Sequence, residues 1–243
     1  MKLEGKTAVV VGGGSGIGAG IALALAAEGC RTLIAGRRMA RLDETAAAWN
    51  GEPPLLTHEV DVTDRASVRQ LFEDARRELS QIDILVISAG INIKTRTMAT
   101  MTAEQWDDVL ATNATGAFNC IAEVLPEMRT RHNGLIINIS SIAGKRAIQL
   151  GGVAYCASKF AMTALGTAIG NEVASDGVRV TNVYPGEVNT PILENRPKPV
   201  SEQQKAAMVQ PEDVGSLIVA IAALPPRAHV PELIIKPTVQ EYV

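Results

Sequence analysis

Two residues that could exchange a proton stand four apart in the second half of the chain. Residues 155–159 read YCASK, and on a helix this spacing places Tyr155 and Lys159 on the same face. The reference pKa of tyrosine is ~10, so proton exchange near neutral pH requires about 4 kcal/mol of phenolate stabilisation. A cation ~5 Å away at an effective dielectric of ~20 supplies about 3 kcal/mol. The pair therefore predicts a tyrosine acid and base whose pKa a lysine lowers, although the same spacing is common on helices without such a role.

Two serines and an asparagine could complete such a site. Ser140 and Ser141 close an apolar run that reads as a buried strand, and a hydroxyl there can hydrogen-bond a substrate oxygen as charge develops. Asn113 stands inside a long helical segment, where asparagine is unfavourable. A water-binding or backbone-bridging role would explain it. Alternatively, Ser141 caps the loop and Asn113 is an ordinary polar residue without a special role.

A glycine-rich segment follows the first apolar run of the chain. Residues 12–18 read GGGSGIG and lead directly into an Ala/Leu-rich helical segment. Glycines let the backbone approach a pyrophosphate, and a helix N-terminus offers N–H groups and partial positive charge. A tight strand-to-helix turn would also need glycines, but the place after the first strand of a repeated βα pattern favours a dinucleotide site. The expected contacts are Gly12, Gly14, Ser15, Gly16, Ile17 and Gly18.

The second apolar run ends in two arginines, Arg37 and Arg38. A carboxylate here would favour NAD, whereas guanidinium groups match the charge and geometry of a 2′-phosphate. The preferred cofactor is therefore NADP(H), with NAD(H) as a second option, and Arg37 is the one expected to face the adenine. Alternatively, both arginines cap a solvated loop. Asp61, after the third run, could accept a hydrogen bond from the adenine amino group or begin a turn and cap the next helix.

Short apolar runs alternate with helical segments along the whole chain. The expected strands cover residues 7–11, 32–35, 55–60, 82–87, 135–139, 178–183 and 233–235. The expected helices cover residues 17–28, 39–49, 64–79, 103–128, 153–175 and 211–224, with Asp64 as a plausible N-cap. Repeated strand–helix–strand units imply a mostly parallel sheet with helices on both faces and a ligand beyond the carboxyl ends of the strands. A long stretch at about 187–207 has no clear strand and is typical of a substrate lid.

Composition excludes several classes of protein. The chain has 243 residues, 47% of them hydrophobic, and a net charge of −3 without a basic block, so we expect one domain over 1–243 and no nucleic-acid partner. No apolar stretch reaches the ~20 residues of a membrane span. Three scattered cysteines without CxxC spacing argue against disulfides or zinc, no group has metal-ligand spacing, and a cytoplasmic location fits best.

These motifs, in this order, resemble the short-chain dehydrogenase/reductase superfamily, and the resemblance covers essentially the whole chain. The residues that carry it are Gly12, Gly16, Gly18, Asn113, Ser141, Tyr155, Lys159, Pro185 and Gly186. It implies an α/β Rossmann fold: a doubly wound, mostly parallel seven-stranded sheet of order 3-2-1-4-5-6-7 with helices on both faces. It also implies a homotetramer or homodimer in which the long helices around Asn113 and Tyr155 pair between subunits.

By position, the resemblance implies a role for each motif residue. Tyr155 would be the catalytic acid and base, Ser141 would position the carbonyl, Lys159 would bind the nicotinamide ribose and lower the tyrosine pKa, and Asn113 would hold a water in a proton relay. The remaining implied cofactor contacts are Arg37, Arg38, Asp61, Val62, Ser88, Ala89, Gly90, Tyr155, Lys159, Pro185, Gly186, Val188 and Thr190.

The chain departs from the superfamily pattern in three places. Val11 stands where threonine is usual, residues 87–90 read ISAG where Asn-Asn-Ala-Gly is usual, and Ser140 competes with Ser141 for the serine role. Residues 224–240 are similar to a branch that includes NADP-dependent 3-hydroxy-acid dehydrogenases, which leaves the substrate open. The expected function is an NADP-dependent carbonyl reductase or alcohol dehydrogenase acting on a small carbonyl or hydroxy compound. The alternatives are a regulator that senses NADP without catalysis, and an isomerase or dehydratase that uses the same tyrosine.

Overall fold

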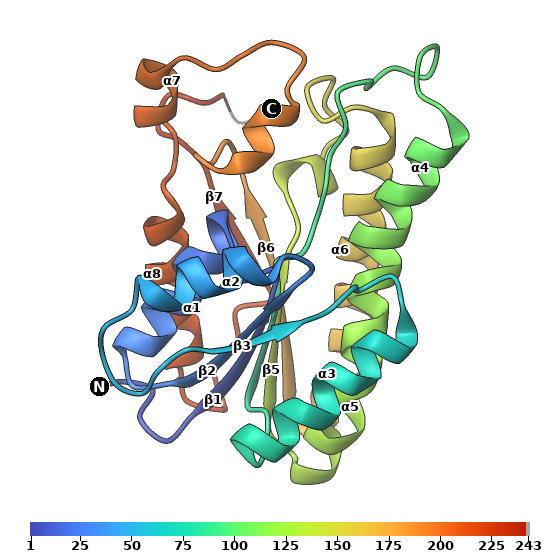
Figure 1. Ribbon diagram of the computed structural model, residues 1–243. Coiled ribbons are helices and arrows are strands. Elements are labelled where there is room, and N and C mark those ends of the chain that lie inside the picture. Colours follow the sequence, from blue (N-terminus) through green and yellow to red (C-terminus); the bar gives the residue numbers. More distant parts are fainter. Residues whose placement is uncertain (242–243) are drawn as a thin grey trace.

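Seven strands form one parallel sheet in the computed structural model, which describes residues 1–241 (Figure 1). The strands are β1 (Thr7–Val11), β2 (Arg31–Gly36), β3 (Leu56–Glu59), β4 (Ile84–Ile87), β5 (Gly134–Ile139), β6 (Val178–Pro185) and β7 (Glu232–Ile235). Their order in the sheet is β3-β2-β1-β4-β5-β6-β7, and each neighbouring pair is parallel. The fold class and strand order predicted from the sequence are thereby confirmed.

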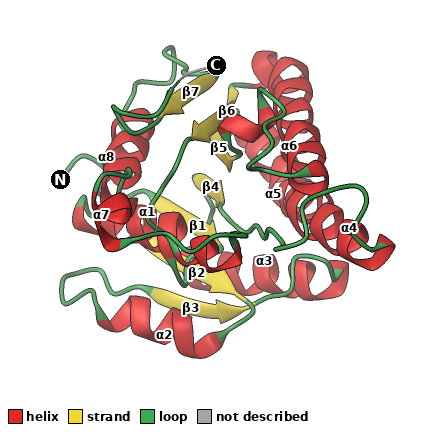
Figure 2. Cartoon of the chain, turned by 90° about the horizontal axis from the view of Figure 1, so that it is seen from above, coloured by secondary structure: helices red, strands yellow, loops and turns green. Residues whose placement is uncertain are grey.

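Helices cover both faces of this sheet, as Figure 2 shows from above. The α-helices of the described chain are α1 (Gly16–Ala27), α2 (Met39–Ala47), α3 (Arg65–Leu79), α4 (Ala103–Leu110), α5 (Gly116–Arg131), α6 (Val153–Val173), α7 (Glu202–Ala206) and α8 (Pro211–Ala222). Apolar residues of α1 and α8 pack with Val10 and Ile34 on one face. Those of α3, α5 and α6 pack with Val9 and Leu33 on the other. Alternate residues of each strand therefore enter opposite cores, as the two-residue period of a strand requires.

The register of the sheet brings the carboxyl ends of the inner strands to one edge. Val11 pairs with Ile87, which pairs in turn with Asn138, and Ile139 pairs with Val183. The loops that follow β1, β4, β5 and β6 therefore leave the sheet side by side. In the described part of the chain, no helix combines the length and the hydropathy that a bilayer crossing requires.

The one helix predicted over residues 103–128 is divided in the structure. A π-helical turn, η1 (Ala111–Thr115), separates α4 from α5 and contains Asn113. A π turn inserts an extra residue into the helical repeat and occurs frequently at functional sites. Elsewhere the bounds differ little from the prediction, and the Asp64 carboxylate accepts a hydrogen bond from the Ala66 N–H as the N-cap of α3.

Candidate active site

A cavity of about 730 Å³ lies at the carboxyl edge of the sheet. Its walls come from the ends of β1, β2, β4, β5 and β6, from α6, and from the segment after β6. This volume lies within the range of small-molecule and cofactor sites. Most of the residues predicted for the site line it, although they come from distant parts of the sequence.

The glycine-rich loop is shaped for a group that approaches the backbone closely. Gly12 has φ +87°, and a Cβ there would lie 2.4 Å from the Ala89 nitrogen, so only glycine fits between β1 and the loop after β4. Ser15 precedes α1 without a side-chain cap, which leaves N–H donors of the first helical turn for an anion. Of the predicted loop contacts, Gly12, Gly14, Ser15, Gly16 and Ile17 line the cavity. Gly18 lies behind them against the Gly12 carbonyl.

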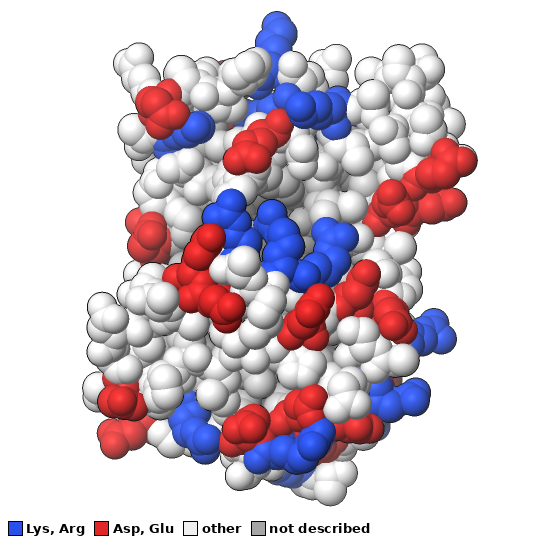
Figure 3. All heavy atoms as spheres, viewed as in Figure 1, with Lys and Arg blue, Asp and Glu red and all other residues white. Residues whose placement is uncertain are grey.

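Three arginines line the end of the cavity beside α2. Arg37 and Arg38 follow β2 as predicted, and the sequence reasoning missed Arg41, one turn into α2. Arg41 forms a 2.6 Å ion pair with Glu44. Figure 3 shows basic side chains gathered around the hollow near the centre of this face. The dinucleotide cradle and the neighbouring positive charge fit an adenosine 2′-phosphate.

Asp61 does not line the cavity, whereas Val62 does. The Asp61 carboxylate accepts hydrogen bonds from the Thr63 N–H at 2.9 Å and the Thr63 hydroxyl at 2.7 Å. The first of these bonds, with help from the nearby charge of Arg37, lowers the pKa of Asp61. The structure thus shows the turn that the sequence offered as the alternative role, but the helix cap is Asp64.

The opposite wall of the cavity comes from the loops after β4 and β6. Ser88, Ala89, Gly90, Pro185, Gly186, Val188 and Thr190 all line it, as predicted. The side-chain oxygen of Gln240, near the end of the described chain, accepts a hydrogen bond from the Glu187 N–H at 2.9 Å. Gln240 and Glu187 also line the cavity, and neither was predicted.

Ser141 and Tyr155 both line the cavity, close enough for their side chains to interact. Burial raises the pKa of Tyr155, while the hydrogen bond with Ser141 and the charge of Arg96 lower it. Ser140 is turned away: its hydroxyl donates to the Lys159 carbonyl at 3.2 Å and lies 3.0 Å from the Thr163 hydroxyl. The Ser141 hydroxyl accepts a hydrogen bond from the Ala143 N–H at 3.1 Å as the N-cap of the 3₁₀ helix η2 (Ile142–Gly144). The loop-capping role is therefore present, and the choice of Ser141 over Ser140 as the functional serine stays a prediction.

Lys159 is buried beneath Tyr155. Its Nζ donates to the carbonyl of Ile139 at 2.8 Å and lies 5.7 Å from the centre of the Tyr155 ring. Burial lowers the pKa of Lys159 to about 8. The causes that lower the Tyr155 pKa in the structure are the Ser141 side chain and the charge of Arg96. That Lys159 also lowers it stays a prediction.

Asn113 is fully buried and bridges two segments. Its side-chain oxygen accepts from the Ile91 N–H at 2.8 Å, and its amide donates to the Ile91 carbonyl at 3.0 Å and the Ser158 hydroxyl at 2.9 Å. The backbone-bridging role considered from the sequence is therefore present. Asn113 does not line the cavity but lies behind Gly90, where a Cβ would be 3.3 Å from its oxygen and 3.4 Å from Lys159 Nζ.

The segment after β6 closes over one side of the cavity. Residues 190–196, which include the 3₁₀ helix η4 (Pro191–Asn195), line it, whereas α7 and the residues before it do not. Arg196 forms a 2.7 Å ion pair with Glu187. The part of the predicted lid that faces the cavity is thus its first half.

Comparisons with known proteins agree with this geometry. A family model described as short chain dehydrogenase matches residues 6–201. The chain is 36% identical over 241 residues to the glycine betaine reductase of Emericella nidulans, which covers 97% of this chain but 19% of that protein. It is 34% identical over 239 residues to an uncharacterised oxidoreductase of Staphylococcus saprophyticus, covering 98% of this chain and 99% of the other.

Two solved structures superimpose on nearly the full chain. One is an alcohol dehydrogenase from the archaeon Thermococcus sibiricus complexed with 5-hydroxy-NADP, with a TM-score of 0.87 and 25% identity over 98% of this chain and 99% of that one. The other is the closed form of a serine dehydrogenase complexed with NADP+, with a TM-score of 0.88 and 28% identity over 97% and 96%. Both share the fold and carry a nicotinamide cofactor.

Proposed function

The chain belongs to the short-chain dehydrogenase family and is an NAD(P)-dependent oxidoreductase acting on CH–OH groups; from this premise we propose that it is an NADP-dependent carbonyl reductase or alcohol dehydrogenase with Tyr155 as acid and base. The observation that carries the proposal is one cavity that is lined by Ser141, Tyr155 and Lys159 and by the glycine-rich loop. The substrate is a small carbonyl or hydroxy compound.

The proposed chemistry divides between cofactor and protein. When bound, the nicotinamide supplies or accepts the hydride. In the reducing direction Tyr155 gives its phenolic proton to the substrate oxygen, and Ser141 hydrogen-bonds that oxygen as negative charge develops. The Lys159 ammonium, 5.7 Å from the ring centre, stabilises the phenolate that remains. In this proposal Asn113 positions the loop after β4 and the Ser158 hydroxyl. It also holds a water that belongs to the relay through which Tyr155 exchanges its proton with solvent.

The preference for NADP rests on Arg37, Arg38 and Arg41. They line the cavity where β2 ends, and the two residues that directly follow β2 in the sequence are arginines rather than a carboxylate residue. Solved structures of related proteins are complexed with NADP. The charge of Arg41 is partly neutralised by its ion pair with Glu44, so Arg37 and Arg38 would contribute most of the affinity for the 2′-phosphate.

We also propose a homotetramer or homodimer, which the superfamily resemblance implies. Its support here is the exposure of large apolar side chains on the long helices: Phe118 of α5 is 47% exposed and Phe160 of α6 is 42% exposed. Light scattering that gives a monomer in solution would contradict it. The cytoplasmic location stays a prediction from cysteine content.

The test of the mechanism is Tyr155→Phe, which removes the hydroxyl and keeps the ring. We expect NADPH binding to be unchanged and turnover to fall by at least about 10³-fold, because no other group supplies the proton. The measurement is NADPH absorbance against a panel of aldehydes and ketones, with fluorescence titration of the cofactor as the control. Full activity of this variant would refute the role of Tyr155, and product formation without net NADPH consumption would indicate an isomerase or dehydratase instead.

A further inference from the structure

Arg96, in the loop between β4 and α4, is fixed beside the start of the helix that carries Tyr155. Its carbonyl accepts a hydrogen bond from the N–H of Val153, the first residue of α6. Gly152 has φ +81°, and a Cβ there would lie 2.6 Å from Arg96 Cβ. Only glycine at position 152 leaves room for the Arg96 side chain, so Gly152 allows Arg96 to pack against the start of α6.

The Arg96 guanidinium is held at the cavity wall by three backbone carbonyls. Nε donates to Ile93 at 3.0 Å, Nη2 donates to Asn195 at 2.8 Å, and Nη1 donates to Leu150. The three carbonyls belong to the loops after β4, β5 and β6. A guanidinium has five N–H donors, so two remain for another acceptor while the group is held rigidly.

This cation lacks a counterion in the protein. Within residues 1–241, no carboxylate lies at ion-pair distance from Arg96, whereas the neighbouring Arg196 is paired with Glu187. Desolvation, followed by repulsion from Arg196, lowers the pKa of Arg96. Partly buried charges are normally paired, because losing water without a counterion costs free energy. An anion bound in the cavity would supply the missing partner.

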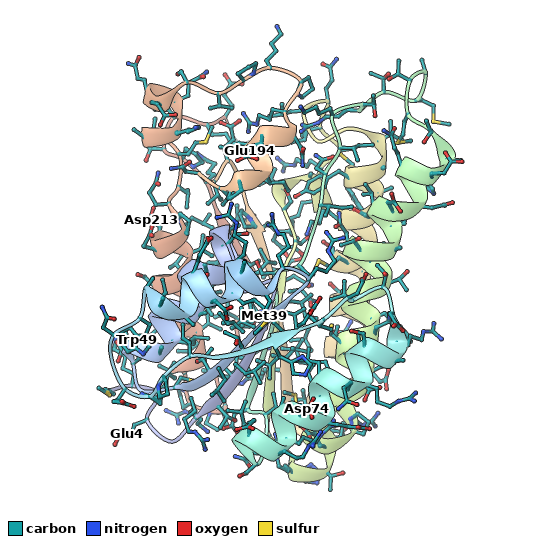
Figure 4. All side chains as sticks on the ribbon, viewed as in Figure 1. Glu4, Met39, Trp49, Asp74, Glu194 and Asp213 are labelled. Carbon is teal, nitrogen blue, oxygen red and sulfur yellow. The ribbon has the colours of Figure 1, made fainter. Side chains whose placement is uncertain are left out.

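The other acidic residue of this wall does not replace that anion. Glu194 also lines the cavity, but its side chain is exposed to water on η4, and Figure 4 shows it on the segment above the carboxyl ends of the strands. Solvent screens such a charge. Arg96, by contrast, lines the same cavity as Tyr155, and the two side chains affect each other's charge, so an anion bound to Arg96 would share that cavity with Tyr155.

We propose that Arg96 binds a carboxylate of the substrate, and hence that the substrates are hydroxy acids and the corresponding oxo acids. The inference deepens the proposed function and rests on it. The arrangement presents a planar fork with two free N–H groups, which matches the two oxygens of a carboxylate. Neutral alcohols of the same shape would leave the cation unpaired.

The test compares acids with neutral isosteres. Substrates are 2- and 3-hydroxybutanoate and their methyl esters, each as both enantiomers, and the achiral 4-hydroxybutanoate and its methyl ester, all oxidised with NADP+. We expect the wild-type enzyme to prefer at least one acid to its ester, and the preferred chain length reports the distance from Arg96 to the reacting carbon. Arg96→Met should reduce kcat/KM for that acid by about 10- to 100-fold, the effect of losing a charged hydrogen bond. The ester should change by less than about threefold.

Two further variants separate charge from structure. Arg96→Lys keeps the charge without the fork, and we expect an intermediate loss for the acid. Lys198→Gln removes a positive charge from the segment after β6, outside the cavity lining, and should leave kcat/KM for both kinds of substrate unchanged. Competitive inhibition of the wild-type enzyme by butanoate, but not by butanamide, is expected even if a variant fails to fold.

The results that would overturn the proposal are distinct from those against the proposed function. Equal losses of kcat/KM for acid and ester in Arg96→Met would show that Arg96 only holds the three loops together and does not bind the substrate carboxylate. Turnover of neutral alcohols with rejection of every acid, or equal inhibition by butanoate and butanamide, would exclude the carboxylate site while leaving the Tyr155 chemistry intact. If no alcohol or carbonyl is turned over at all, the proposed function itself is wrong.

Discussion

Burial of the Lys159 ammonium lowers the stability of the folded protein, although the same side chain is proposed to stabilise the Tyr155 phenolate. The side chain is 4% exposed and its nearest oxygen partner is the Ile139 carbonyl, without a carboxylate. Its pKa of about 8 lies below the ordinary value of 10.5, and the gap corresponds to roughly 3 kcal/mol against the charged form. The sequence predicts that Lys159 binds the nicotinamide ribose and lowers the tyrosine pKa, but the motif does not reveal that the ammonium is desolvated.

A pH-dependent stability follows from this burial. Between pH 8 and 10.5 the unfolded chain holds the Lys159 proton more tightly than the folded one, so the free energy of unfolding rises with pH over that window. Relative to Lys159→Met, the cofactor-free wild-type protein should therefore gain up to about 3 kcal/mol from pH 7.5 to pH 10.5. Urea unfolding of both proteins across this range measures the difference, in which the other titrating groups cancel. A constant difference would show that the ammonium is solvated.

At the scale of elements, the contact between α1 and α8 holds the glycine loop in place. A Cβ on Gly20 of α1 would lie 2.6 Å from the carbonyl of Pro211, and one on Gly215 of α8 would lie 2.6 Å from the Gly20 carbonyl. The two backbones therefore meet without side chains between them, which holds α1, the helix that follows the glycine loop, against α8.

Gly20→Ala should lower the free energy of unfolding by roughly 1–3 kcal/mol, because backbone atoms must move apart. Gly170 of α6 is the matched control, since its added Cβ would meet Val180 at an ordinary 3.4 Å. Gly170→Ala should be neutral or stabilising by up to about 1 kcal/mol, from helix propensity alone. Thermal and urea unfolding give both values, and equal effects at the two positions would argue against the close contact.

The elements were predictable where a periodic pattern records burial, and less so where the backbone departs from regular geometry. Buried parallel strands such as β1 and β5 are continuous apolar runs, and the motif resemblance supplied their order in the sheet. The π turn at Asn113 changes the helical repeat by one residue without changing composition. Arg96 was missed because a residue in an irregular loop has no pattern, although its place after a central strand and the Gly151-Gly152 pair ahead of α6 were signals.

At the scale of the whole molecule, the cofactor joins the two halves of the sheet. The cavity runs from Arg37 and Arg38 after β2 to the segment after β6, so a bound dinucleotide contacts both sides of the point where the strand order reverses. Binding to the folded state alone stabilises the whole domain. At a hundredfold excess over its dissociation constant the ligand adds about 2.7 kcal/mol, which for a chain of 243 residues raises Tm by roughly 5–10 °C.

We expect NADP+ to raise Tm by this amount at a concentration where NAD+ has a much smaller effect, because only NADP+ carries the 2′-phosphate that Arg37 and Arg38 are proposed to bind. Replacing both arginines with alanine should remove most of the NADP+ shift, an affinity loss of at least about tenfold, and leave the NAD+ shift unchanged. Arg69→Ala, which deletes an exposed arginine of α3 outside the cavity lining, controls for net charge. Equal shifts with the two cofactors in the wild-type protein would mean that the arginines cap a solvated loop and that the fold accepts either nucleotide through the glycine cradle alone.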